Sequence, residues 1–577
     1  MKARSSYLIQ ALVLTALVGA VNLVSGTRFA RLDLTADQRY TLAPATLRTL
    51  DSLDAILTVN LYLEGDFQPR IKRYTDAVRT TLLEMKARVG SRLQFQFHNP
   101  TDNSDLQREL VRKGVRPVPI DYKAEDGSTA RKWIFPAAVL TYRGGEQVVN
   151  LLGGSCVFAG EGVRCDFTRA EEQIEYQLAV NIERLLRGKK RLVGLLSGHG
   201  ETPPEAMTEL VGELQRSYNV LEVNLRQSRG EAIPSSKYML PDSLRKGIEG
   251  EGIDVLLVLQ PDSAFTEREK YEIDQFVMRG GRVLWILDNQ RVNQQDFYGA
   301  TGATLSQTRD LQLDDLFNRY GFRLRPALVQ DDLAGTLPVT ATFDNREMIV
   351  PRKWVFFPMA VALADHPVAR NLRGCLYRYA SCLDTVSVPE VVHRPIIFSS
   401  PYSRPIDAPA FIELERLIAQ PPPRQVYRGK GSLILGLEVE GHFRSLFANR
   451  QAPTDATMPK PPTAKFLAGT AFPNRMIVLA DGALVLPHHA PQFGGPDMPF
   501  DNKALILNSI EYLMGNAALA ELRMKQATIH ALDARKVQGN EGWLRAVNVA
   551  APVVLFALVG LARAWLRRRR NLNLRRP

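Results

Sequence analysis

Apolar and polar positions follow a strand, helix, strand order in the first third of the chain. Residues 55–65 are rich in strand-forming types, and residues 68–90 carry apolar side chains at the spacing of one helix face. A strict alternation follows, with Leu93, Phe95 and Phe97 on one side. Two further strand-like stretches lie at 133–142 and 147–152. The pattern predicts a small α/β domain of thioredoxin-like type, although no C-x-x-C motif for dithiol chemistry is present.

Continuous apolar runs mark the second part of the chain. Strands are expected at 191–196, 253–259 and 282–287, with helices between them, and the pair Thr266 and Glu269 has the spacing of a capping box. Strands that are apolar on both faces and alternate with helices indicate a doubly wound, largely parallel sheet. After Asn289 the pattern loosens. Two later strands and an amphipathic helix are predicted at 432–441, 474–486 and 501–516.

Each end of the chain has an apolar segment beside basic residues. Residues 7–24 contain no charge and have the length that a membrane-crossing helix needs, and residues 547–565 are similar, with Arg563 close enough to the end for its charge to reach the interface. Because Lys and Arg collect on the cytoplasmic side, both termini are predicted to be cytoplasmic, with the bulk of the chain exported from a bacterial inner membrane. The alternatives are a cleaved signal peptide for the first segment and a buried core helix for the second.

The charge of the chain belongs mainly to these ends. The 577 residues carry a formal net charge of +12, and a chain of this length is expected to fold as more than one domain. Nine of the 73 basic residues flank the apolar end segments, which leaves 64 against 61 acidic residues elsewhere. A nucleic-acid partner is therefore not supported, whereas contact with membrane lipid is.

The four cysteines form two local pairs, Cys156 with Cys165 and Cys375 with Cys382. Neither pair has the spacing of a zinc or redox motif, and an even number in an exported region suits disulfides. Both pairs are therefore predicted disulfides, and four buried free thiols remain the alternative.

A polar cluster follows the strand at 191–196, where catalytic residues often lie. It comprises Ser197, Gly198, His199, Gly200 and Glu201. In open parallel sheets ligands bind beyond the carboxyl ends of the strands, and Gln260 and Asp288 follow two other predicted strands. One crevice is therefore expected to collect all seven residues.

The known catalytic arrangements do not match this cluster. The nucleophile elbow, the dinucleotide turn and a cysteine at a strand end are all missing, and no histidine has metal-ligand spacing. The adjacent pair His488 and His489 is the remaining metal candidate, and neither a metal nor a cofactor is predicted. For the cluster at 197–201 three interpretations stay open: a tight structural loop, a ligand or partner contact, and catalysis.

Several stretches in order resemble the GldG family, the auxiliary component of gliding-motility-type ABC transport systems. They are LDLTADQRYTLAPAT, LYLEGDFQPR, FQFHNP, LLSGHGE, FVMRGGRVLWILD, NRMIVLADG and NKALILNSIEYLMGN. The resemblance implies a second domain of glutamine-amidotransferase-like, flavodoxin-type fold without catalytic groups. It also implies partners on separate chains, namely a permease and an ATPase, since this chain has no nucleotide-binding motif. The stretch after Val478 lacks the family's usual turn, which leaves a ligand contact at Asp481 unsupported.

The sequence thus predicts a non-enzymatic, doubly anchored auxiliary subunit that binds a partner or an unspecified cargo. The expected division is 1–26 (cytoplasmic tail and first transmembrane helix), 40–187 (thioredoxin-like), 188–518 (amidotransferase-like), 519–546 (linker) and 547–577 (second transmembrane helix and basic tail). Two rival functions are a periplasmic hydrolase or amidase that uses His199, and an envelope protein that binds glycan.

Overall fold

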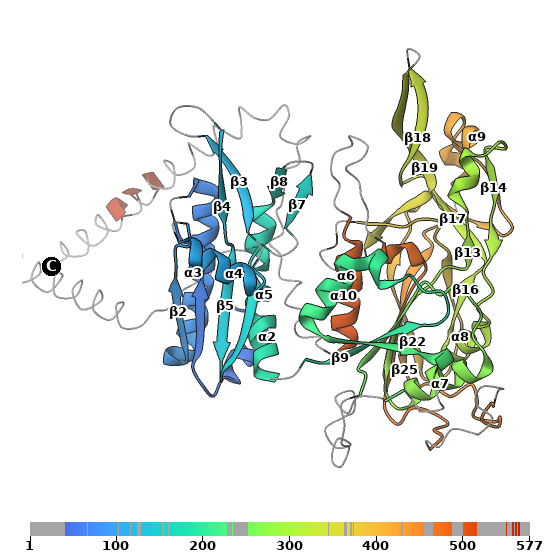
Figure 1. Cartoon of the computed structure of the whole chain (residues 1–577), viewed down its shortest axis with the longest axis horizontal. Coiled ribbons are helices and arrows are strands. Elements are labelled where there is room, and N and C mark those ends of the chain that lie inside the picture. Colours follow the sequence, from blue (N-terminus) through green and yellow to red (C-terminus); the bar gives the residue numbers. More distant parts are fainter. Residues whose placement is uncertain are drawn as a thin grey trace, which may run out of the picture. The chain divides into compact units, whose positions relative to one another are not determined.

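A computed structural model describes residues 41–515, apart from internal gaps, and a few residues between 550 and 565. The longest gaps are 235–251, 455–464 and 487–499. Residues 1–526 form one compact unit and residues 527–577 form a second. The first unit has a mixed α/β fold with a large mixed sheet, part of which is parallel (Figure 1).

The predicted membrane segments are hardly described. Within the part of the chain that the structure describes, no helix is both long and apolar enough to cross a bilayer. Segment 7–24 lies outside the described residues, and so does most of segment 547–565. The described residues of the second segment are helical and include Leu558 and Trp565, both more than half exposed. Both membrane helices therefore stay predictions.

The first part of the chain forms a four-stranded sheet in the order β2-β1-β5-β6. Strand β1 runs parallel to β2 and antiparallel to β5, and helix α3 makes the crossover between β1 and β2. The predicted helix at 68–90 is confirmed, because its apolar stripe is buried in α3 and the helix ends at Gly90 with φ of 64°. The elements are α2 (Pro44–Asp51), β1 (Leu57–Leu61), α3 (Pro69–Val89), β2 (Leu93–Phe97), α4 (Ser104–Arg112), β3 (Val118–Lys123), β4 (Thr129–Ile134), β5 (Ala137–Tyr142), β6 (Gly145–Asn150), β7 (Cys156–Ala159), β8 (Gly162–Cys165) and α5 (Phe167–Arg187).

One of the two expected disulfides is present. Cys156 and Cys165 face each other at the open end of the β7–β8 hairpin and are bonded. The second expectation is corrected, since Cys375 and Cys382 are both free and buried. Their strands have different partners: β20 (Cys375–Leu376) pairs with β19 (Arg346–Ala362), whereas β21 (Cys382–Thr385) pairs with β16 (Phe322–Arg325). The two cysteines therefore lie on strands that do not pair with each other, although both belong to the same buried cluster.

The large sheet combines a parallel half with an antiparallel half. Its main path is β10-β9-β11-β12-β26-β25-β22-β19-β18, in which the first five strands are mutually parallel. Strand β25 then runs antiparallel to β26 and starts the second half. The predicted strands at 191–196, 253–259 and 282–287 are confirmed as β9 (Leu192–Ser197), β11 (Val255–Leu259) and β12 (Arg282–Ile286).

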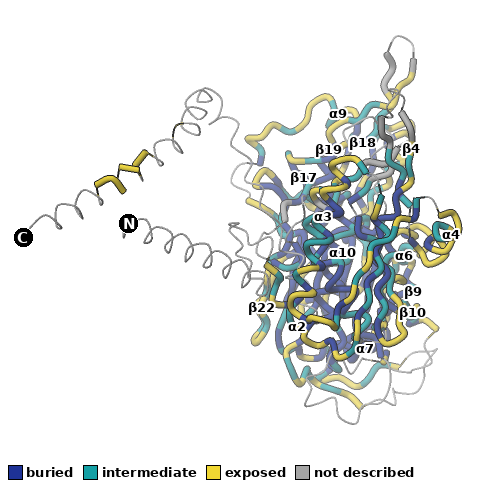
Figure 2. Tube along the Cα trace, turned by 90° about the vertical axis from the view of Figure 1, so that its left-hand side faces the viewer, coloured by how far each residue is buried: buried dark blue, intermediate teal, exposed yellow. Residues whose placement is uncertain are grey.

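Both faces of the parallel half are covered. Leu195 and Leu196, neighbours in β9, belong to two different buried clusters. Helices α6 (Thr208–Ser217) and α10 (Asn502–Leu513) contribute to the first cluster, and α7 (Glu267–Met278) and α8 (Asp314–Tyr320) contribute to the second. Figure 2 shows the resulting burial of α10. This arrangement explains why the parallel strands read as continuous apolar runs.

The antiparallel half was only partly predicted. The strand at 432–441 is confirmed as β25 (Ile434–Gly441). The strand expected at 474–486 is confirmed only as β26 (Asn474–Leu479), since Gly482–Val485 form a 3-10 helix. The long β18–β19 hairpin was missed. Prolines at 338, 351 and 358 interrupt its strand pattern. Pro338 lies in the edge strand β18, where proline is tolerated, and the other two lie in β19. The remaining elements are β10 (Asn219–Asn224), β13 (Gln290–Arg291), β14 (Ala303–Leu305), β15 (Gln307–Thr308), β17 (Ala327–Asp331), β18 (Ala334–Phe343), β22 (Val391–Phe398), β23 (Ser403–Asp407), β24 (Phe411–Glu413) and α9 (Leu414–Ala419).

Candidate functional site

The predicted cluster lies at the carboxyl edge of four adjacent parallel strands. Strands β9, β11, β12 and β26 are neighbours in the sheet, so the loops that follow them emerge on one edge. The loop after β9 carries Ser197 to Glu201, while Gln260 follows β11 and Asp288 follows β12. Asp481, which follows β26, joins them. The parallel order of the strands therefore assembles the site, as the sequence analysis expected.

Hydrogen bonds connect these loops directly. The Thr202 hydroxyl donates to Gln260 Oε1 at 2.6 Å, and Gln260 Nε2 donates to Asp288 Oδ2 at 2.8 Å. The amide of Gly482 also donates to Asp288. Gln260 has a φ of 54°, a left-handed conformation that is uncommon for a residue with a side chain. The predicted polar residues at the strand ends thus mainly bond to one another.

His199 lies wholly inside this edge. Its side chain is fully buried, its Nδ1 is 3.3 Å from Glu201 Oε1, and its Nε2 is 3.1 Å from Glu269 Oε2. The ring stacks on Phe265 with 3.8 Å between the centroids. Both ring nitrogens therefore face carboxylates of the protein itself, which leaves the imidazole unable to reach a substrate in this conformation.

The two carboxylates determine the protonation of His199. Burial alone lowers the pKa of His199, but Glu201 and Glu269 raise it, and the net result is a pKa above the ordinary value. Burial raises the pKa of Glu269, and His199 with the backbone of Thr266 lowers it, with a net lowering. Each shift favours the charged form, so the contact of His199 with Glu269 favours an imidazolium beside a carboxylate. Arg226 also approaches Glu269, at 3.9 Å.

This ion cluster predicts a pH-dependent stability. Because the folded pKa of His199 lies above 6.5, its contribution is complete below that pH and is lost as the pH rises through the raised pKa. Glu269 has the opposite sign, since its contribution is present above pH 4.5 and is lost as the pH falls through the lowered pKa. We expect the urea midpoint of the wild type to fall from about pH 6.5 upward, and this slope to be missing in His199→Gln.

The difference in pH slope between the wild type and His199→Gln isolates the contribution of His199. Carboxyl groups whose pKa values burial raises, such as those of Asp274 and Asp331, titrate in both proteins and cancel in the comparison. Equal slopes in wild type and His199→Gln would show that His199 is neutral in the folded protein.

Two glycines give the loop after β9 its shape. Gly198 has a φ of 106°, and a Cβ there would lie 2.8 Å from Asn224 Oδ1. Gly200 has a φ of 76°, and a Cβ would lie 3.1 Å from Asp262 Cβ. The backbone carbonyl of His199 accepts from the amides of Asp262 and Ser263 at 2.8 and 2.9 Å. The loop is therefore tied to the turn after β11, and the sequence interpretation as a tight loop describes its local structure.

Asp288 and Asp481 form a second buried acidic feature at the same edge. Burial raises the pKa of both carboxyl groups, and the charge of Asp288 raises the pKa of Asp481 further. Asp481 accepts from the amides of Arg378 and Ala483 at 2.6 and 2.8 Å, and Arg309 lies 3.6 Å from Asp288. Among the described residues no group of three or more His, Cys, Asp or Glu is placed to hold a metal ion. His488 and His489 lie outside the described residues.

Some residues of the site were missed by sequence reasoning. Glu269 was assigned only to a helix cap, although one carboxyl oxygen accepts from Thr266 and also lies near His199. Asp481 could have been assigned to the site from the sequence, because it follows a parallel strand in the same way as Asp288. Arg309 lies in an irregular segment, and its sequence context gives no indication that it contacts Asp288.

The free cysteines offer no nucleophile. Burial raises the pKa of Cys375 and raises that of Cys382 to about 12, so both stay protonated thiols at neutral pH. We expect no cysteine of the native protein to react with an alkylating reagent. Two should react after denaturation and all four after denaturation with a reductant, as counted by intact mass. A peptide in which Cys375 is linked to Cys382 would contradict this assignment.

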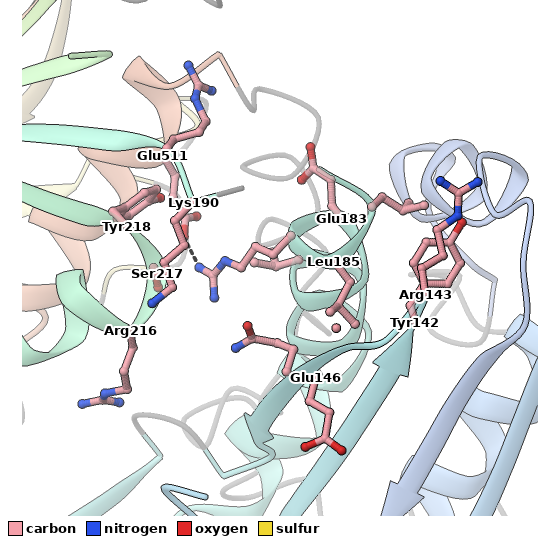
Figure 3. Close-up of a pocket in the computed structure, with 16 residues that line it drawn as sticks. Tyr142, Arg143, Glu146, Glu183, Leu185, Lys190, Arg216, Ser217, Tyr218 and Glu511 are labelled. Carbon is pink, nitrogen blue, oxygen red and sulfur yellow. Dashed lines mark ion pairs between the residues drawn. The ribbon is translucent and has the colours of Figure 1, made fainter. Parts of the chain in front are cut away.

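A separate crevice of 540 Å³ lies near the amino-terminal side of β9. Figure 3 shows Arg216 and Tyr218 on one wall and Tyr142 and Arg143 on the other. Glu511 of α10 belongs to the lining, and it accepts a hydrogen bond of 2.6 Å from the Tyr176 hydroxyl of α5. The crevice therefore adjoins a direct connection between α5 and α10. Its lining mixes charged, polar and apolar side chains from several elements, a pattern that sequence reasoning does not detect.

The fold and the site together define a class: an α/β module whose sheet edge is occupied by its own paired side chains. Residues 190–509 match the model of an auxiliary-protein family described as ABC-type uncharacterized transport system. The chain belongs to this family, and it is an auxiliary component associated with an ABC-type transport system. The disulfide suggests an extracytoplasmic domain, since such bonds persist in oxidising compartments.

Other comparisons add little. Residues 36–141 match a domain of unknown function, DUF7088. No curated protein matches the chain. Among solved structures, a chain titled mmIFT52 N-terminal domain is 10% identical, covers 59% of this chain and 100% of its own length, and has a TM-score of 0.29. A TM-score this low carries no weight for fold or function.

Proposed function

We propose that this chain is a non-enzymatic, membrane-anchored subunit of a gliding-motility-type ABC transport system, related to GldG. The observation that carries the proposal is the complete burial of His199 between two carboxylates at the edge where an amidotransferase-like sheet would present its reactive groups. A hydrolase that uses this imidazole would need it accessible. The match over residues 190–509 supports the transport role.

The proposed domain division follows the two sheets. A thioredoxin-like domain at 40–187 is supported by the order β2-β1-β5-β6 with a parallel β1–β2 pair. An amidotransferase-like domain at 188–518 is supported by the parallel order β10-β9-β11-β12. Residues 1–26 and 547–577 would anchor the chain, and residues 519–546 would link the second domain to its anchor. Both termini would be cytoplasmic, and the Cys156–Cys165 disulfide favours export of the part between them.

Contact with a partner or cargo would use the accessible parts of the sheet edge. Gly200 and Asp262 are exposed there, and Ser197, Gly198 and Gln260 are partly exposed. His199, Glu201 and Asp288 would act indirectly, by holding these loops in place. The permease would contact the membrane helices, and a separate ATPase would complete the system.

Co-isolation tests the proposal. We expect the tagged full chain, purified in mild detergent, to bring down a permease and an ATPase. Deleting residues 547–577 should abolish their recovery if the anchor packs against the permease. Gly212→Ala is the matched control, because nothing lies within 4 Å of its added Cβ, and it should retain both partners. Repeated recovery of the full chain alone would contradict the proposed role.

A further inference from the structure

Helix α3 carries three cations in one line. Lys72, Arg79 and Lys86 are spaced by seven residues, which places them on one stripe of the helix, away from its buried face. Lys72 and Lys86 are exposed and Arg79 is half-buried. Leu83 lies within the same stripe and is 51% exposed, which is unusual for a large apolar side chain on a helix with a well-packed opposite face.

Two phenylalanines of the neighbouring edge strand adjoin this line. The Arg79 guanidinium lies 3.9 Å from the Phe97 ring centroid, and the Lys86 ammonium lies 5.6 Å from that of Phe95. Both rings are half-buried, and β2 is the end strand of its sheet. We call Lys72, Arg79, Leu83, Lys86, Phe95 and Phe97 the α3–β2 patch. It combines cations with partly accessible apolar side chains, as surfaces that bind at a membrane interface do.

Two of the three arginines on the other flank of α3 differ from the cations of the patch; Arg70, the third, has no ion pair among the described residues. Arg73 lies 3.5 Å from Glu171 and Arg88 lies 2.7 Å from Asp51, so both have carboxylate partners. No such ion pair involves Lys72, Arg79 or Lys86 among the residues that the structure describes. Asp76 is the exposed carboxylate beside the stripe, and the local balance stays positive. The patch therefore carries positive charge that no carboxylate of the described residues neutralises by an ion pair.

The position of the patch in the chain indicates what neutralises it. The predicted first membrane helix ends near residue 24, and the described domain begins at residue 41. Seventeen extended residues span at most about 60 Å, so the tether keeps the patch near the membrane. Under such tethering a weak contact suffices, because docking becomes an intramolecular event.

We propose that the α3–β2 patch docks on anionic phospholipid headgroups of the membrane in which the chain is anchored. The cations would bind the phosphate groups, and Leu83 would enter the boundary between headgroups and acyl chains. This inference rests on the proposed anchoring. Docking would fix the orientation of the first domain relative to the bilayer.

The test uses the full chain in lipid nanodiscs with a probe at the patch. Leu83→Cys provides a site for an environment-sensitive fluorophore, because the native cysteines are bonded or buried. We expect a more apolar probe environment in discs with anionic phosphatidylglycerol than in phosphatidylcholine discs, and reversal by high salt. Changing Lys72, Arg79 and Lys86 to Gln should lower the ratio of docked to undocked protein by about a hundredfold.

Two controls make the result decisive. Changing Arg70, Arg73 and Arg88 to Gln removes the same charge from the other flank and should leave the probe signal intact. Because Arg79 also packs on Phe97, a Lys72→Gln, Lys86→Gln variant repeats the test without disturbing that contact, and circular dichroism checks its folding. An equal signal in both lipids, equal losses in both sets of variants, or a signal that appears only with added partner protein would overturn the proposal. Failure of the chain to enter the discs would instead count against the anchoring.

Discussion

Replacing His199 with alanine is expected to lower the free energy of unfolding by about 3–5 kcal/mol, because it leaves buried charge without a partner. Glu201 and Glu269 have side chains that are only 5% and 6% exposed, and the imidazolium lies between them. The change also removes the ring that stacks on Phe265. Denaturant unfolding and the cellular abundance of the chain would measure the loss.

His98→Ala is the matched control for this change. His98 is half-buried, contacts Asn60 at 3.2 Å and stacks on Tyr62, but it has no carboxylate partner among the described residues. We expect it to cost about 1 kcal/mol. If His199→Ala instead abolished function while the unfolding free energy stayed at the wild-type value, the imidazole would have a chemical role and our assignment would be wrong.

Gly482→Ala is expected to destabilise the protein by about 1–3 kcal/mol or more, since it overpacks a filled site. The added Cβ would lie 2.4 Å from Gln260 Cγ and 2.6 Å from Asp288 Oδ2. Neither side chain can easily retreat, because Gln260 bonds to both Thr202 and Asp288, and Asp288 accepts from the amide of Gly482 itself. The variant should therefore loosen the edge that joins β11, β12 and β26.

Gly212→Ala is the matched control for Gly482→Ala. It lies within α6, where alanine favours the helix by up to about 1 kcal/mol and meets no atom within 4 Å. We expect the two glycine variants to shift the unfolding midpoint in opposite directions. A Gly482→Ala protein as stable as the wild type would mean that the edge is loosely packed in solution.

Local pattern was sufficient for the elements that bury a regular face. The stripe of α3, the alternation of β2 and the apolar runs of β9, β11 and β12 each follow from side-chain periodicity, which depends on neighbours in the sequence. Pairing of Cys156 with Cys165 was also accessible, because a hairpin brings nearby residues together. Cys375 and Cys382 are just as close in sequence, yet their strands pair with different partners.

The sequence by itself determined the alternation of strands and helices in the parallel half, and hence that Ser197, Gln260 and Asp288 would meet at one edge, because parallel neighbours share their carboxyl ends. Only the tertiary structure decided which of these groups water can reach. His199 follows its strand in a loop, but α7 and Phe265 cover it, and Glu269 comes from 70 positions further along the chain. Burial and long-range charge pairing depend on how elements pack, which no local pattern encodes.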